Sequence, residues 1–214
     1  MSAQHDSRGN QKERTRAAIV EAATRILRDG ATPTVAAAAA AAKVSRATAY
    51  RYFPTPEALH LEVAGVTPTY GPVEQMLQTL EGDDVEARLA TLLKVLNSVT
   101  FANEGQMRMA LKVYLDTWLG RRDAGETPVR EGRRMRWLEA VLEPAKRGTT
   151  RKQWRRLQAA LALTVGADAM VIMKDVCRMG DAEAQEILLW AAQTLLRGGL
   201  KEHNVARTAR RSKS

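Results

Sequence analysis

The stretch SRATAYRYF, which begins at Ser45, gathers side chains that bind phosphate groups and the edges of DNA bases. Arg46 can make a bidentate contact with guanine, and Ala47 can touch a thymine methyl group. Arg51 follows on roughly the same face of a helix, within reach of a base or a phosphate. The hydroxyl groups that suit phosphate oxygens are those of Thr48 and Tyr50. This pattern predicts a helix that reads DNA, with a solvated helix surface as the alternative.

Two short helices joined by a tight turn are needed to present this stretch. Seven consecutive alanines, residues 36–42, precede it, and Thr34 is a candidate N-cap for the helix they form. Ser45 is a candidate N-cap for the second helix, which the Phe-Pro-Thr-Pro sequence from residue 53 ends. Apolar residues at helical spacing predict a bracing helix from Lys12 to Gly30. The pattern indicates a helix-turn-helix, with a low-complexity alanine tract as the alternative.

The net charge of +9 is concentrated at the two ends of the chain. Residues 1–54 carry nine Lys and Arg against four Asp and Glu. Residues 55–200 carry nineteen of each kind, and residues 201–214 carry five basic residues against one acidic residue. A basic N-terminal segment on a neutral body favours a polyanionic partner, with a solvated basic surface as the alternative.

Residues 12–63 resemble the DNA-binding domain of the TetR (tetracycline-repressor) family, most closely in VSRATAYRYFPTPEAL. The resemblance implies an N-terminal three-helix helix-turn-helix domain, followed by a larger helical effector-binding and dimerisation domain. It also implies a homodimer that binds a palindromic operator in double-stranded DNA, usually as a repressor, and is released by a small-molecule effector. The candidate DNA-binding residues are Lys12, Arg16, Thr34, Ser45, Arg46, Ala47, Thr48, Tyr50, Arg51 and Tyr52.

Three positions depart from the family pattern. Lys43 stands where the turn usually has glycine, and a positive φ there would cost lysine about 1 kcal/mol. Ala38 replaces a bulky aliphatic residue, so we expect looser packing. Pro56 replaces a lysine that often contacts phosphate, and the backbone N–H groups at the start of that helix are a possible substitute.

The whole chain has an all-α pattern, because glycine and proline are few and runs of β-branched residues are rare. We expect a disordered basic arm, a helix-turn-helix domain, a helical effector-binding and dimerisation domain, and a mobile basic tail. Their ranges are 1–11, 12–63, 64–200 and 201–214. The helices expected beyond the helix-turn-helix span residues 56–65, 71–81, 84–101, 104–120, 128–146, 150–178 and 182–198.

The last two expected helices, over about 150–178 and 182–198, carry apolar stripes that fit the family's four-helix dimer interface. An intrachain core is the alternative use of these stripes. Their residues are Leu157, Leu161, Val165, Ile172 and Val176, then Ile187, Leu188, Ala191, Ala192, Leu195 and Leu196. Asp168 falls within the first stripe, where a carboxylate needs a partner. That partner is either a ligand or second chain, or an arginine in the core.

An effector pocket could be lined by aromatic and methionine side chains, which adapt to varied ligands. The candidates are Met107, Tyr114, Trp118 and Trp137, together with Asp168; ordinary core positions are the alternative for each. Residues 121–156 carry twelve Lys and Arg against five Asp and Glu. This surplus is typical of a solvated face, and it also leaves room for an anionic effector.

The sequence does not favour an enzyme. Its three histidines are dispersed, and no glycine-rich phosphate loop or metal-ligand spacing occurs, so we expect no metal and no cofactor. The single Cys177, the polar N-terminus and the lack of a long apolar stretch favour the bacterial cytoplasm, with nucleoid association when bound to DNA. The rival functions are a non-specific DNA-binding protein and a helical enzyme or ligand-binding protein that has lost operator recognition.

Overall fold

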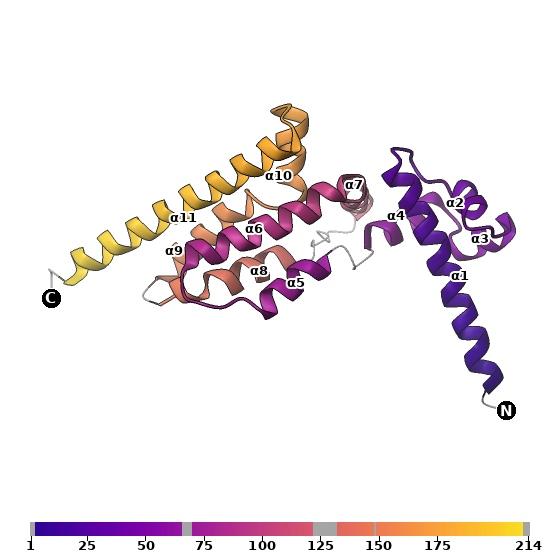
Figure 1. Cartoon of the computed structure of the whole chain (residues 1–214), viewed down its shortest axis with the longest axis horizontal. Helices are drawn as coiled ribbons and strands as arrows, with labels where there is room; N and C mark the ends of the chain where they lie inside the picture. The colour runs from indigo at the N-terminus through magenta and orange to yellow at the C-terminus, as the bar shows by residue number, and fades with distance from the viewer. Residues whose placement is uncertain (1–2, 66–69, 122–131, 148, 212–214) are drawn as a thin grey trace. The chain divides into compact units, whose positions relative to one another are not determined.

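The computed structural model describes residues 3–65, 70–121, 132–147 and 149–211. Within these ranges the chain forms helices and no strand, which confirms the all-α class (Figure 1). The helices group into two compact units. Unit 1 contains α1 (Ala3–Arg28), α2 (Val35–Ala41), α3 (Arg46–Tyr52), α4 (Pro56–Gly65) and α7 (Glu104–Arg121). Unit 2 contains α5 (Gly71–Gln78), α6 (Val85–Ala102), α8 (Arg133–Leu142), the 3-10 helix η3 (Glu143–Ala145), α9 (Arg151–Ala162), α10 (Ala167–Val171), the π-helix η4 (Ile172–Val176) and α11 (Asp181–Arg211).

The core of unit 1 is built around small side chains. Ala38 and Ala39 of α2 and Ala49 of α3 are completely buried, and α2 packs against both α1 and α3. The larger residues of this core are Ile19, Val35, Phe53, Leu59 and Val63. Ala38 is fully shielded from solvent in this contact despite its small side chain. Whether the small side chain loosens the packing of α2 remains a prediction.

Helix α7 packs against α4 and α1, although it lies far from them in the sequence. The side-chain amide of Gln106 donates a hydrogen bond to the carbonyl oxygen of Val63 at 2.8 Å. A Cβ atom on Gly105 would lie 3.2 Å from the carbonyl oxygen of Leu27, so a small residue suits this approach. The grouping differs from the expected continuous domain over 64–200, since α7 belongs with the helices of the N-terminal region.

The core of unit 2 is made of large leucine, valine and tryptophan side chains. It includes Leu89, Leu92, Leu93, Leu96, Trp137, Leu138, Val141, Leu142, Trp154, Leu157 and Leu161. Arg88 of α6 donates hydrogen bonds to the carbonyl oxygens of Ala140 and Val141 at the end of α8. Arg197 of α11 is ion-paired with Glu86 of α6, and this hydrogen bond lowers the pKa of the Glu86 carboxyl.

The expected single helix over 150–178 is wrong, because the chain breaks between α9 and α10. Arg134 of α8 occupies the break: its guanidinium donates to the carbonyl oxygen of Ala162 at 3.1 Å and to Asp168 at 2.7 Å. Gly166 passes beside this guanidinium with φ +85°, and a Cβ atom there would lie 2.8 Å from Nη2 of Arg134. The turn around Arg134 therefore needs glycine.

Both ends of the chain are more helical than expected. Instead of a disordered arm over 1–11, α1 begins at Ala3, and instead of a mobile tail over 201–214, α11 continues to Arg211. Adding one residue to an existing helix avoids the cost of nucleation, and lysine, arginine, glutamine and glutamate are good helix formers. The expected helix over 128–146 corresponds to α8 and η3, and its residues 128–131 lie outside the described residues.

Candidate nucleic-acid interface

Helices α2 and α3 are two short helices joined by a tight turn, at the positions where the sequence analysis expects a pair of helices. The hydroxyl of Thr34 accepts a hydrogen bond from the N–H of Ala37 at 3.1 Å, so Thr34 is the N-cap of α2. Ser45 caps α3 in the same way, accepting from the N–H of Thr48 at 3.1 Å. The turn closes through Lys43, whose φ is 54°. Lys43 therefore adopts the positive φ that is expected where the family usually has glycine.

Helix α3 has one buried face and one exposed face. Ala49 is completely buried and Phe53, its C-cap, is almost so. The opposite face exposes two arginines, a small residue and a tyrosine that is 46% exposed: Arg46, Ala47, Arg51 and Tyr50. Because this face carries donors for base edges and phosphates and is not covered within unit 1, it has the chemistry of a surface that reads DNA.

The other hydroxyl groups of the expected DNA-binding set are engaged in helix capping. The Ser45 and Thr48 hydroxyls lie 2.8 Å apart and share a hydrogen bond, and Thr48 is half-buried. Thr34 belongs to α2 rather than to the exposed face of α3. The structure therefore gives Ser45 and Thr48 a role at the start of α3 and Thr34 a role at the start of α2, while a contact of their oxygens with phosphate remains a prediction.

Tyr52 lies on the flank of α3 and not on its exposed face. It is half-buried and packs against the core of unit 1. The guanidinium of Arg51 lies over its ring, 5.7 Å from the centroid, which is a cation–π geometry. Tyr52 therefore positions Arg51, and we expect little direct contact between Tyr52 and DNA.

The two candidate residues of α1 differ in their partners. Arg16 is ion-paired with Glu62 of α4, and its guanidinium lies 5.7 Å from the centre of the Phe53 ring. Lys12 is exposed one turn earlier on α1. Arg16 thus joins α1 to α3 and α4 while remaining partly exposed, and Lys12 extends the basic surface.

The start of α4 is occupied by the chain's own side chains. Thr55 caps the helix by accepting a hydrogen bond from the N–H of Ala58 at 3.2 Å. A hydrogen bond from its own backbone N–H, and another from the Thr55 hydroxyl, lower the pKa of the Glu57 carboxyl. The N–H groups of Glu57 and Ala58 beside Pro56 therefore already have partners within the chain, and their replacement of a phosphate-binding lysine remains a prediction.

The expected effector-pocket residues are divided between the two units. Met107, Tyr114 and Trp118 lie on α7 in unit 1, where Met107 is buried and the two aromatic side chains are exposed. Trp137 is buried in unit 2 and donates to the carboxylate of Glu74 at 2.8 Å. Asp168 has an arginine partner within its own unit, Arg134, which is the simpler of the two expected arrangements. Neither unit by itself brings these five residues together.

Two buried polar residues that the sequence analysis did not single out lie on α6. Asn97 and Thr100 are buried, and their side-chain oxygens have no hydrogen-bond partner within the described part of the chain. Their spacing of three residues places them on one face of the helix. A buried polar oxygen without a partner costs about 1–3 kcal/mol, so a bound water or ligand is expected beside it. Leu96, Val99 and Phe101 are their apolar neighbours in the sequence, and nothing in that pattern marks them as polar core positions.

No protein-family model, curated protein or solved structure matches this chain. None of the described helices is both long and apolar enough to cross a membrane. Within the ranges that the structure describes, no three His, Cys, Asp or Glu side chains are placed to hold a metal ion. The geometry of α3 and the polar residues of α6 are therefore the observations on which a function can be built.

Proposed function

We propose that this protein is a non-enzymatic, ligand-responsive transcriptional regulator of the TetR type. A homodimer binds a two-fold symmetric operator through α3 of each chain, and a small-molecule effector releases it from DNA. The observation that carries this proposal is the exposed face of α3, where Arg46, Tyr50 and Arg51 point away from a well-packed, capped helix-turn-helix. Repression is the family's usual behaviour and is the mode we propose.

The capped geometry supports sequence-specific contacts rather than general attraction to polyanions. Both helices begin at hydrogen-bonded N-caps, and Ala49 and Phe53 fix the rotation of α3 about its axis. A helix held in one rotation places Arg46 at a defined depth in the major groove, which bidentate recognition of guanine requires. A non-specific DNA-binding protein has no need for such a fixed helix.

Dimerisation is supported by exposed apolar side chains on unit 2. Leu163, Val176 and Trp190 are 77%, 75% and 66% exposed, and Ile172 is also exposed. They lie at the end of α9, on η4 and on α11, elements of the two segments expected to form the dimer interface. Large apolar side chains on connected helices are typical of a protein–protein interface. The break after α9 separates Ile172 and Val176 from the buried part of their expected stripe.

The effector is proposed to bind inside unit 2 near Asn97 and Thr100. Both side chains are buried, their oxygens have no partner among the described residues, and the neighbouring Leu96 belongs to the leucine-rich core of unit 2. An effector with hydrogen-bond donors would satisfy both oxygens. Binding between helices of this bundle would then be coupled to dimer geometry through α6 and α11, which pack together.

The test is binding of the purified chain to DNA from immediately upstream of its own gene, compared with scrambled DNA over a range of salt. We expect selective binding, with a dissociation constant that rises steeply with salt. Arg46→Ala should weaken operator binding by about 1–3 kcal/mol, or roughly 5- to 150-fold, and relax selectivity at one base pair. Arg28→Ala, at an exposed position at the end of α1, is the matched control and should leave affinity unchanged.

Each other outcome identifies a rival. Equal affinity for both DNAs, followed by failure of a random-sequence selection to yield a preferred site, would establish a non-specific DNA-binding protein. No binding to either DNA at low salt, or in the random selection, would leave a ligand-binding protein without operator recognition. Tyr50→Phe removes one hydroxyl and should weaken binding less than Arg46→Ala does.

A further inference from the structure

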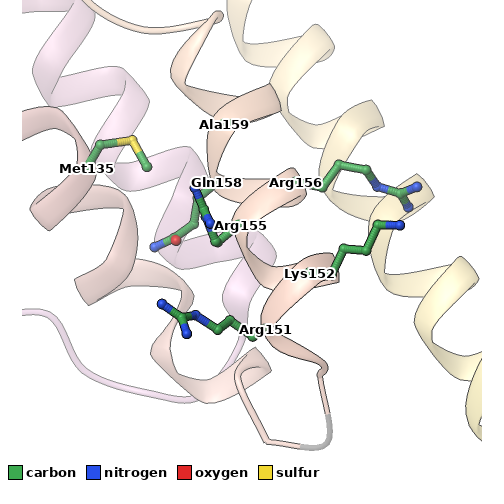
Figure 2. A pocket seen from close by; sticks show the side chains of 7 residues that line it. All are labelled: Met135, Arg151, Lys152, Arg155, Arg156, Gln158 and Ala159. Carbon is green, nitrogen blue, oxygen red and sulfur yellow. The ribbon is translucent and has the colours of Figure 1, made fainter.

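A cationic cavity lies on α9 in unit 2, beside α8 (Figure 2). Its volume is about 870 Å³, within the range of small-molecule sites. Figure 2 shows Gln158 and Arg151 on the side of α9 that faces Met135, and Lys152 and Arg156 on the other side of the helix in that view. The lining residues are Met135, Arg151, Lys152, Arg155, Arg156, Gln158 and Ala159.

Three of the four cations that line this cavity are crowded together. Arg151, Lys152 and Arg155 occupy little more than one turn of α9, and within the described residues none of them has an ion pair. Like charges four residues apart on a helix repel each other. Glu139, an acidic residue of α8, is already ion-paired with Lys146 at 2.8 Å. An anion bound beside these exposed cations would supply their counter-charge.

The cavity also has features that an inorganic anion would not use. Gln158 is only 7% exposed, yet its side-chain amide makes no hydrogen bond with any described residue. It offers a donor and an acceptor to the interior of the cavity. Met135 and Ala159 add apolar surface, and methionine adapts to ligands of varied shape. Cations at an exposed edge, an amide within and apolar walls match a ligand with an anionic and an apolar end.

We propose that this cavity binds an organic phosphate, a small molecule with a phosphate or polyphosphate group joined to an apolar or aromatic part. Arg151 and Arg155 hold the phosphate, since the guanidinium group matches phosphate oxygens in a bidentate way. Gln158 bonds a polar group of the organic part, which packs against Met135. This site shares no residue with α3 or with Asn97 and Thr100, so it does not depend on the proposed operator binding.

A small molecule fits this site better than a nucleic acid backbone. A duplex presents phosphates on a broad convex surface and could reach the exposed arginines, but it has less access to Gln158, which is only 7% exposed. Two substitutions distinguish a small organic phosphate from duplex DNA. Arg155→Gln removes a contact that either ligand would use, whereas Gln158→Leu removes a contact that only the small molecule would use. Leucine is close to glutamine in size, so the packing of α9 is retained.

The experiment is calorimetric titration of the full chain at 50 mM salt with three probes, namely ATP, coenzyme A and inorganic triphosphate. We expect ATP or coenzyme A to bind at least about tenfold more tightly than triphosphate. Arg155→Gln and Gln158→Leu should each weaken that binding about tenfold. Lys94→Gln, at an exposed cation on α6 outside the cavity, is the matched control and should change nothing.

Three results would overturn the proposal. Equal affinity for triphosphate and the organic phosphates would show a general anion surface. Binding that survives both Arg155→Gln and Gln158→Leu would place the ligand elsewhere, and so would absence of binding for all three probes at 1 mM, on the order of the weakest ligand affinities. Release of the bound probe by short duplex DNA, with Gln158→Leu silent, would assign these cations to nucleic acid. None of these results bears on operator binding by α3, which the Arg46→Ala assay tests.

Discussion

The two units bury their interiors in different ways. In unit 1 the contacts of α2 are made by alanines, and the geometry is fixed by N-caps, a tight turn and close helix approach. In unit 2 leucine, valine and tryptophan side chains from α5, α6, α8, α9 and α11 pack together. Alanine side chains bury little apolar area, so the stability and helix positions of unit 1 depend more on its hydrogen-bonded N-caps. The large side chains in the core of unit 2 make its stability depend on how well their shapes fit together.

The same contrast separates the two proposed binding surfaces. The DNA-reading face needs one rigid helix in a defined rotation, which local caps and small residues provide. The organic-phosphate cavity needs side chains from two helices, α8 and α9, that the core of unit 2 holds together. Substitutions that affect local geometry should therefore act on DNA binding, and substitutions in the leucine core should act on ligand binding.

The largest effect is expected for Leu93→Ala in unit 2. Leu93 is completely buried, and the cavity left by its truncation should lower the free energy of unfolding by about 2–5 kcal/mol. Urea unfolding followed by circular dichroism measures the loss, and hydrogen exchange localises it to α6 and α8. Lys94→Ala, exposed on the same helix, should stay within about 0.5 kcal/mol. Equal loss of amide protection in α2 would mean that the two units unfold as one.

In unit 1, where the core contacts of α2 are made by alanines, we expect a larger side chain to be destabilising. Ala39→Leu forces a larger group into the fully buried contact of α2 and should lower the free energy of unfolding by about 1–3 kcal/mol. The neighbouring Ala40 is exposed, so Ala40→Leu is a matched control within the same alanine run. Similar effects of the two substitutions, measured by thermal unfolding, would show that the alanine run is a spacer without close packing.

Loss of the α3 N-cap should affect stability less and DNA binding more. Ser45→Ala removes the hydroxyl that accepts from the N–H of Thr48 and should lower the free energy of unfolding by about 1 kcal/mol. Because the cap also fixes the start of the reading helix, operator affinity should fall although Ser45 itself reads no base. Ser45→Thr keeps the hydroxyl and should retain most of both properties. Unchanged operator affinity in Ser45→Ala would show that the N-cap stabilises α3 but is not needed for DNA recognition.

The local features of unit 1 could be predicted from the sequence because each is encoded within a few residues. Thr34 and Ser45 are N-caps as expected, α4 begins at Pro56, and the turn has a positive φ at Lys43. The buried and exposed faces of α3 follow from helical periodicity alone. Whether these exposed residues bind DNA is a question of function, which no local pattern settles.

The missed features depend on partners that are distant in the sequence. The break after α9 is made by Arg134 of α8, whose hydrogen bonds to Ala162 and Asp168 replace helical continuity. The grouping of α7 with α1 and α4 depends on Gln106 reaching the backbone of Val63. A periodic apolar pattern cannot reveal either contact, because it indicates which residues are buried but not which distant residues they pack against. The cationic cavity combines residues from two helices in the same way.

The smallest effect compares one strained residue in each unit. Lys43 and Arg178 have φ values of 54° and 56°, a region in which glycine is favoured because it has no Cβ atom. Lys43→Gly and Arg178→Gly should each raise the free energy of unfolding by less than about 1 kcal/mol, since the relief of strain is partly offset by the greater entropy of unfolded glycine. Denaturant unfolding measures both, with Lys43→Ala as the control that removes the charge but keeps the Cβ. If Lys43→Gly also weakens operator binding while Lys43→Ala does not, then stiffness of the turn, rather than the lysine charge, holds α3 in position. Loss of affinity in both variants would instead assign the Lys43 ammonium group to a phosphate contact.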